Sequence, residues 1–262
     1  MNIFTAPFVN ALFGSYYLVG NLGWAVVIVT VVIRILLLPL LLPSLKAAKK
    51  TRELQPRLKK LQEKYKGNKE ALAKAQMDFY KQEGVNPLSG CLPQILQIAV
   101  LLLFFSAFNM VTGFASGNGE LAKINSQLIP SFQIDESFKF ETVFMGNGLE
   151  MTPANEFAKG FGMNMALPAF LLIGSALLQF FSSKLMMPAV KTDKNVVKKT
   201  ADKEDDMMSA MRTQSMYMMP AFTLFIGWNF SLGILLYWFV NSGVMLMQQI
   251  LVEKFQKDEK KG

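Results

Sequence analysis

Long apolar runs dominate the pattern of this 262-residue chain. Five of them are nearly free of charged side chains, and most approach the roughly 20 residues that a helix needs to cross the hydrocarbon core of a bilayer. We predict membrane-spanning helices at residues 22–42, 92–111, 167–187, 216–230 and 232–251. The fourth is short, and only the stretch NFSLG separates it from the fifth, so these two should form a tight helical hairpin. The predicted fold class is an all-α membrane protein with five transmembrane helices.

The segments around these spans carry weaker patterns. Residues 1–21 place four large apolar side chains about one helical turn apart, which predicts a helix lying in the membrane interface. Residues 112–166, predicted to be extracytoplasmic, mix Gly, Asn and Ser with isolated aromatic residues, so we predict irregular structure with a short helix or strand pair. Residues 188–215 are polar and predicted to be a mobile cytoplasmic loop, and residues 252–262 form a basic tail.

The segment 43–91 has a helical pattern of its own, because apolar side chains recur at steps of three and four residues. The pattern is broken at KGNK, where Gly67 and Asn68 suit a turn, and it resumes on a second, shorter helix. We predict a cytoplasmic helical hairpin packed like a short coiled coil; a solvated charged connector is the alternative. The residues concerned are Leu54, Leu58, Leu61 and Tyr65 on the first helix and Leu72, Gln76, Phe79 and Tyr80 on the second.

Basic residues are unevenly distributed along the chain, which has a formal net charge of +8. Lys and Arg number twelve in residues 43–91, six in 188–215 and four after residue 251, but three in 112–166 and none in 1–21. Loops rich in Lys and Arg stay in the cytoplasm. We therefore predict a multi-pass protein of the bacterial plasma (inner) membrane, with its N-terminus outside and its C-terminus in the cytoplasm.

The composition excludes several kinds of chemistry. Histidine is absent, which removes His-based acid–base catalysis, Ser-His-Asp triads and HExxH zinc sites. The single cysteine, Cys91, cannot form an internal disulfide. An intramembrane Ser–Lys protease would have only Lys184 with Ser182 or Ser183, at the edge of a span. A secondary transporter would need an acidic relay or repeated halves, and the sequence has neither. We predict no enzymatic activity, no cofactor and no metal.

One charge stands out, because Arg34 lies inside the first predicted span, in the stretch TVVIRILLLPL. An arginine at the centre of a membrane helix costs roughly 2.5–3.5 kcal/mol on insertion scales. Snorkelling would have to cover about eight residues, or about 12 Å, to the cytoplasmic edge at Leu42. An ion pair between Arg34 and a carboxylate on another span is excluded, because none of the 19 Asp and Glu residues falls within the five spans. We therefore favour a hydrated cavity in the protein; snorkelling and an unusual partner are the alternatives.

Polar residues in the spans are the candidates for lining that cavity. Thr30 lies four positions before Arg34 on the same helix face, and Tyr237 lies four before Asn241 with Trp238 beside it. Other spans contribute Gln94, Gln97, Gln179 and Ser242. Each amide taken alone would suit an ordinary hydrogen bond between helices. Together with an arginine that lacks an acid, they indicate a basic cavity with neutral polar walls, suited to a hydrophilic or acidic segment.

Three stretches resemble the YidC/Oxa membrane protein insertases. GWAVVIVTVVIRILLLPL is similar to that family's first core span, and LYWFVNSGVMLMQQ to its last. The stretch from LQPRLKK to VNPLSGCLPQILQI is similar to its cytoplasmic hairpin and second core span. The resemblance runs from about residue 2 to residue 255. It implies a short form without the family's large extracytoplasmic domain, with five helices around a hydrophilic groove that contains Arg34, Thr30, Gln97, Gln179, Tyr237, Trp238 and Asn241.

The resemblance also implies a function, which is insertion of small membrane proteins into the bilayer through the groove without nucleotide hydrolysis. The implied partners are nascent membrane proteins and the lipid bilayer, together with the Sec translocon and the ribosome. No contact with nucleic acid is expected other than with the ribosome. The basic hairpin would touch substrate, ribosome or anionic lipid through Lys59, Lys60, Lys64 and Lys66. A chaperone for the folding and assembly of membrane subunits is the main alternative, and a secondary transporter is a second.

Overall fold

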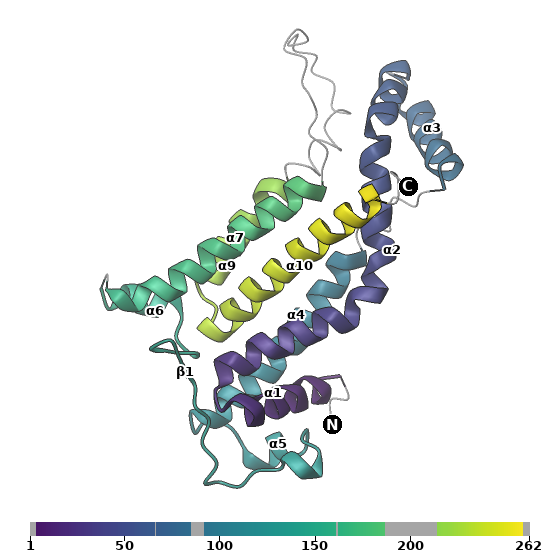
Figure 1. Ribbon diagram of the computed structural model, residues 1–262. Helices are drawn as coiled ribbons and strands as arrows, with labels where there is room; N and C mark the ends of the chain where they lie inside the picture. The colour runs from purple at the N-terminus through teal and green to yellow at the C-terminus, as the bar shows by residue number, and fades with distance from the viewer. Residues whose placement is uncertain (1–3, 66, 85–91, 161, 187–213, 259–262) are drawn as a thin grey trace.

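The chain folds into a bundle of long helices joined by short irregular segments (Figure 1). The computed structural model describes residues 4–65, 67–84, 92–160, 162–186 and 214–258. The long helices are α1 (Ala6–Val19), α2 (Leu22–Lys64), α3 (Lys69–Gln82), α4 (Leu92–Ala115), α7 (Ala166–Met186) and α10 (Leu232–Asp258), and α9 (Met219–Gly227) is a helix of intermediate length. The short elements are α5 (Leu121–Asn125), η2 (Pro130–Phe132), β1 (Val143–Phe144), β2 (Asn147–Gly148), α6 (Pro153–Ala158), η3 (Met163–Met165) and the π-helical turn η4 (Gln214–Met218).

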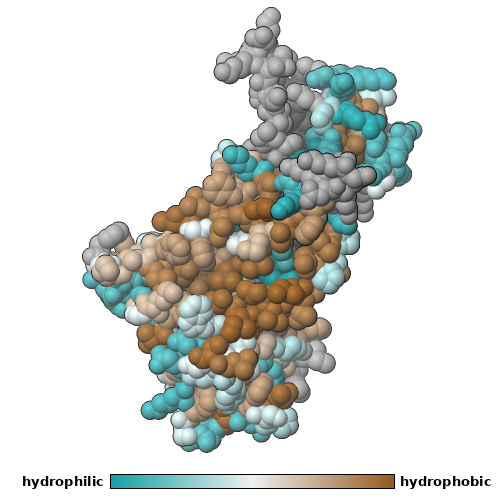
Figure 2. All heavy atoms as spheres, in the orientation of Figure 1, coloured by the Kyte–Doolittle hydropathy of each residue, from teal (hydrophilic) through white to brown (hydrophobic). Residues whose placement is uncertain are grey.

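Within the described residues, four helices are long and apolar enough to cross a membrane, judged by length and composition. They lie in α2, α4, α7 and α10, and Figure 2 shows a hydrophobic band between two more hydrophilic ends of the molecule. The predicted span at 216–230 is represented by a shorter apolar helix, Met216–Gly227. At about 1.5 Å per residue it rises roughly 18 Å, less than the roughly 30 Å of hydrocarbon. A mainly helical membrane protein is thus confirmed, and the fifth span stays a prediction.

The longest helix, α2, continues past the point where the first predicted span ends. Its start is capped by Asn21, whose side chain accepts hydrogen bonds from the backbone N–H groups of Gly23 and Trp24 at 3.0 and 3.3 Å. Three prolines, Pro39, Pro43 and Pro56, lie inside it. Proline removes a helical N–H and pushes on the preceding turn, which bends a helix without ending it. Accordingly α2 changes direction midway and carries the predicted hairpin segment on the same helix (Figure 1).

Most of the core is formed by α1, α2, α4 and α10, with further buried side chains from α7 and from the segment between α4 and α7. The α1 side chains Val9, Leu12 and Phe13 are fully buried in it, so the predicted interfacial helix packs its apolar face against the protein. Helix α10 lies between α7 and α2 (Figure 1). It starts close to α4, since a Cβ at Gly233 would overlap the ring of Phe108. This packing places α2, α4 and α10 around one region at the middle of the bundle.

Helix α3 packs against the last turns of α2. Gly67 supplies the positive φ of 88° that the turn needs, and the side chain of Asn68 caps α3 by accepting from the N–H of Ala71 at 3.0 Å. Arg57 pairs with Glu83 at 2.5 Å across the two helices. A small cluster of Leu54, Leu58 and Tyr80, with Leu61 and Phe79 packed against it, lies between them, and burial raises the pKa of Tyr80. The apolar residues come from the two stripes read in the sequence.

The segment between α4 and α7 has the irregular structure that its composition predicts, including short helices and one strand pair. Strands β1 and β2 are antiparallel, with Val143 opposite Gly148. The segment fixes the starts of two long helices. The N–H of Leu22 donates to the carbonyl of Glu141 at 3.0 Å, and the N–H of Leu232 donates to the carbonyl of Met151 at 2.7 Å. It therefore ties the beginnings of α2 and α10 together at one end of the bundle.

Candidate functional site

The candidate site is built around Arg34, a residue in the first third of α2 that is only 6% exposed. Its Nε donates to Oδ1 of Asn241 on α10 at 2.5 Å, and its Nη2 donates to Oε1 of Gln97 on α4. Both partners are neutral amides from other helices. Across the described residues, no ion pair joins Arg34 to a carboxylate. The positive charge is thus hydrogen-bonded without being neutralised.

A second set of contacts extends this network. Gln97 donates from Nε2 to the hydroxyl of Tyr237 at 3.3 Å, and the ring of Tyr237 stacks on Phe104 with centroids 4.3 Å apart. The Thr30 hydroxyl is also buried, and it donates to the carbonyl of Val26 at 2.6 Å within α2. A chain of polar contacts therefore runs from Asn241 through Arg34 and Gln97 to Tyr237, linking α2, α4 and α10.

These groups line a small cavity. Its polar walls are Thr30, Arg34, Gln97, Tyr237 and Asn241, and five aliphatic side chains of α2 and α4 complete it. The space open to the centre of a water molecule is about 10 Å³, which is about the minimum for a single water. Five of the seven residues predicted for the groove therefore meet around a space far smaller than a polypeptide. The wide hydrophilic groove stays a prediction.

The other predicted site residues lie elsewhere. Gln179 on α7 accepts a hydrogen bond from the hydroxyl of Thr223 on α9 at 2.8 Å. Trp238 is half-buried and packs its ring 5.7 Å from that of Phe230. Neither lines the Arg34 cavity.

The predicted basic residues of the hairpin are described only in part. The side chains of Lys60 and Lys64 are exposed, and the ammonium of Lys64 lies 5.5 Å from the ring centroid of Tyr65. The side chain of Lys59 and the whole of Lys66 lie outside the described residues.

A pair of glutamines near the end of α10 was not singled out in the sequence. Gln248 donates from Nε2 to the backbone carbonyl of Arg34 at 3.1 Å, and Gln249 accepts from the hydroxyl of Ser182 on α7 at 2.8 Å. Both side chains are 7% exposed. The sequence spacing could have identified Gln248, because it follows Asn241 by seven residues and so lies on the same face of α10.

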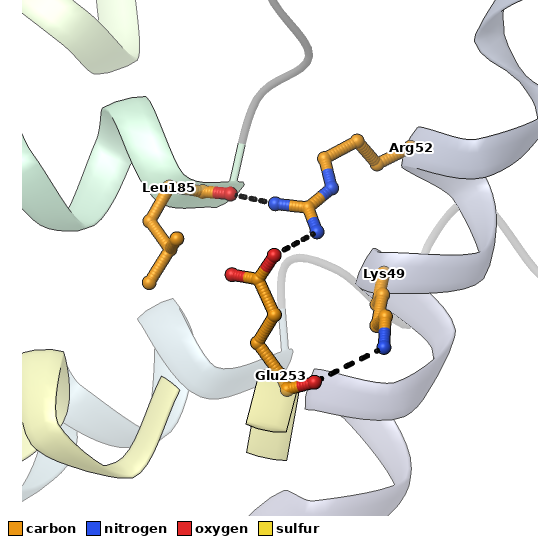
Figure 3. A network of polar contacts seen from close by, with 4 residues as sticks. All are labelled: Lys49, Arg52, Leu185 and Glu253. Atoms are coloured by element: carbon orange, nitrogen blue, oxygen red, sulfur yellow. Dashed lines mark hydrogen bonds and ion pairs between the residues drawn. The ribbon is translucent and has the colours of Figure 1, made fainter. Parts of the chain in front are cut away.

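Further along α2, four residues form what we call the α2–α10 clamp: Lys49, Arg52, Leu185 and Glu253 (Figure 3). Arg52 pairs with the Glu253 carboxylate at 3.2 Å and donates to the carbonyl of Leu185, in the last turn of α7. Lys49 donates to the backbone carbonyl of Glu253 at 3.5 Å. The clamp satisfies a carbonyl that α7 leaves open at its end, and it holds α7 and α10 to α2.

The chemistry of the site follows from its donors. It offers a permanent positive charge, two amides and two hydroxyls, in a region that otherwise consists of aliphatic side chains. Such a set lowers the cost of bringing a polar or anionic group out of water, because hydrogen bonds to a charged donor are strong. Among the described residues, no three Cys, Asp or Glu side chains gather closely enough to hold a metal ion.

Comparisons with known proteins found one family model and several relatives that match the chain. The family model described as "60Kd inner membrane protein" matches residues 14–260. The protein called "Membrane protein insertase YidC" from Treponema denticola is 29% identical over 246 residues, which cover 92% of this chain and 36% of that protein. Its namesake from Pelobacter propionicus is 27% identical over 257 residues, covering 98% and 39%.

Another relative matches a shorter part of the chain at higher sequence identity. The "Membrane protein insertase YidC" of Helicobacter pylori strain 26695 is 44% identical over 96 residues, which cover 37% of this chain and 17% of that protein. The chain spans less than two-fifths of the length of the relatives that it matches along most of its own length.

Proposed function

The chain belongs to the 60Kd inner membrane protein family, and from that premise we propose that it inserts small membrane proteins into the bilayer. The family and the apolar helices make it a multi-pass protein of the bacterial inner membrane. The resemblance to YidC/Oxa insertases read from the sequence is confirmed by the same match. The activity is a proposal for this chain, because the match covers only part of its relatives.

The observation that carries the proposal is that neutral amides hold the buried charge of Arg34. Gln97 and Asn241 hydrogen-bond the guanidinium without cancelling its field. The hydrophilic end of a nascent chain would be received beside this charge, where polar partners lower its desolvation cost. Its apolar segment would pass along the lipid-facing side of the helices, and burial of that segment in the bilayer would drive the process without a catalytic step.

Insertion through this site requires the helices to separate. A cavity for one water cannot hold a peptide, so α2, α4 and α10 would part to form a hydrophilic groove that extends toward Gln179 and Trp238. We count five spans, with the short η4–α9 unit as the fourth. The distribution of Lys and Arg favours an outer N-terminus and a cytoplasmic C-terminus.

That orientation puts the α2–α3 hairpin in the cytoplasm. There Lys60 and Lys64 are exposed and available to a nascent chain, to a ribosome that delivers it, or to anionic lipid. The basic residues Lys59 and Lys66 belong to the same proposed surface. A Sec translocon working beside the protein would use the same route into the bilayer.

The proposal is tested with purified protein in liposomes and single-span substrates that differ only in whether the translocated tail is acidic or neutral. Arg34→Ala should lower insertion of the acidic-tailed substrate more than that of the neutral one, and Arg34→Lys should keep part of the preference. Lys123→Ala, which removes an exposed cation from α5, serves as the control. Equal insertion by the Arg34→Ala variant and its parent would defeat the charge-based mechanism. If the protein in liposomes inserts no substrate but improves the folding of a membrane subunit, the result would point to a chaperone instead.

A further inference from the structure

Helix α10 holds Arg34 at two points. The side chain of Asn241 binds the guanidinium at 2.5 Å, and the side chain of Gln248 binds the backbone carbonyl of the same residue at 3.1 Å. Asn241 and Gln248 are seven residues apart, which is close to two helical turns, so one face of α10 makes both contacts. Both are almost fully buried, at 5% and 7% exposed.

The carbonyl that Gln248 binds lies beside a weak point of α2. Pro39 has no N–H, so the carbonyl of Ile35, four residues earlier, lacks its helical donor, and the proline ring pushes on that turn. Arg34 is the residue immediately before Ile35 and belongs to the same turn. Helix α2 bends in its middle part (Figure 1). Gln248 thus supplies a donor from outside the helix to the turn that the proline loosens.

We propose that Gln248 is a positioning residue for Arg34. By holding the backbone of α2 at this turn, it keeps the guanidinium within reach of both Asn241 and Gln97. Gln248 is not among the residues that line the cavity, so its effect on a substrate must pass through Arg34. This inference rests on the proposed insertase function, since it assigns a residue that sets the strength of the same site.

The neighbouring glutamine provides a matched control. Gln249 is buried to the same extent, but it binds Ser182 on α7 and so fixes α10 on its other side. Replacing either residue by Met keeps the length of the side chain and removes its amide. Only Gln248→Met should change how the site responds to the charge of a substrate.

The experiment measures the ratio of acidic-tail to neutral-tail insertion in liposomes for the parent, Gln248→Met, Gln249→Met, Arg34→Ala and the double variant Arg34→Ala/Gln248→Met. Gln248→Met should lower the ratio about fivefold, the change that one buried hydrogen bond produces, and Gln249→Met should leave it unchanged. In the Arg34→Ala background, Gln248→Met should have no further effect. A normal ratio for Gln248→Met, or effects of the two substitutions that multiply, would overturn the inference.

A second variant covers the case in which Gln248→Met does not fold. Pro39 is exposed, and Pro39→Ala restores the helical N–H, so the double variant Pro39→Ala/Gln248→Met should fold and recover the parent ratio. Failure of that variant to fold or to recover the ratio would also overturn the inference. If Arg34→Ala itself leaves the ratio unchanged, the charge-based mechanism of the proposed function fails, and the positioning role fails with it. If Arg34→Ala lowers the ratio and Gln248→Met does not, the charge-based mechanism stands and only the positioning role is wrong.

Discussion

Replacing Asn241 by Asp is the sharpest single change to the Arg34 site. The substitution keeps the shape of the side chain and puts a carboxylate where Oδ1 now accepts from Arg34 Nε at 2.5 Å. The result should be a hydrogen-bonded ion pair in place of a charge bound to a neutral amide. The protein should still fold, because no donor loses its partner. The site should keep only part of its preference for acidic substrates.

The size of the effect follows from Coulomb's law at the effective dielectric constant of about 20 that suits protein sites. A substrate carboxylate about 4 Å from the guanidinium is attracted by about 4 kcal/mol, and an Asp carboxylate about 8 Å away on the far side repels it by about 2 kcal/mol. Half of the attraction is therefore lost. A difference of about 2 kcal/mol corresponds to about thirtyfold in the insertion of an acidic tail relative to a neutral one.

The assay uses single-span substrates whose translocated tails carry from none to three aspartates, inserted into liposomes and scored by protease protection. For the parent, the logarithm of the insertion yield should rise with the first aspartate. For Asn241→Asp the same rise should be about half as large. Asn229→Asp adds the same charge at an exposed position after α9 and should behave like the parent. An unchanged slope in Asn241→Asp would refute the idea that the field of Arg34 selects the tail.

Other parts of the structure give further expected outcomes. Glu253→Gln removes the ion pair with Arg52. Because these side chains are 22% and 21% exposed, the free energy of unfolding in detergent should fall by only about 0.5–1 kcal/mol. No measurable fall would mean that the ion pair of the clamp does not stabilise the protein. Gly233→Ala puts a Cβ into the ring of Phe108 and should cost about 1–3 kcal/mol in the same assay, whereas an unchanged melting temperature would contradict the close approach of α10 to α4. Burial raises the pKa of Tyr80 above the usual value of about 10, so the stability that its neutral form gives the hairpin is complete below that pH and is lost as pH rises through the raised pKa. Absorbance titration of the parent against Tyr80→Phe measures it, and an ordinary pKa would contradict the burial.

The helices could be predicted from the sequence because lipid-crossing segments must be long and apolar, and four of the predicted spans have this length. The end of α2 could not be predicted. At Leu42 the composition changes from apolar to basic, and Pro43 follows, so the pattern indicates a boundary. The change from apolar to basic residues shows where the surroundings of the helix change from lipid to water. Whether the helix itself continues depends on its backbone geometry. The chain remains helical to Lys64 because a proline bends a helix that its neighbours hold in place.

The candidate site was partly predictable for a related reason. Spacing by four residues pairs Thr30 with Arg34 and Tyr237 with Asn241, because such residues share one face of a helix. All four line the same small cavity. Periodicity does not say which helices are neighbours, so the sequence could not distinguish Gln97, which meets Arg34, from Gln179, which binds α9 instead. The backbone contact of Gln248 was missed because spacing places Gln248 on the same face of α10 as Asn241 but does not show which backbone carbonyl its side chain reaches.

The described partners of Arg34 are neutral amides and not carboxylates, and this difference affects how much free energy it costs to separate α2, α4 and α10. Separating a buried ion pair leaves an uncompensated charge, and removing one partner of such a pair costs about 3–5 kcal/mol. A neutral amide can exchange the guanidinium for water with little net change, since protein and water hydrogen bonds are nearly equivalent. Of the five N–H groups of a guanidinium, the contacts seen among the described residues use two, so incoming water or substrate finds donors still open. Under the proposed function, such a site could therefore open for a peptide at low cost, and an acidic tail would provide the counter-charge that the described residues of the protein lack there.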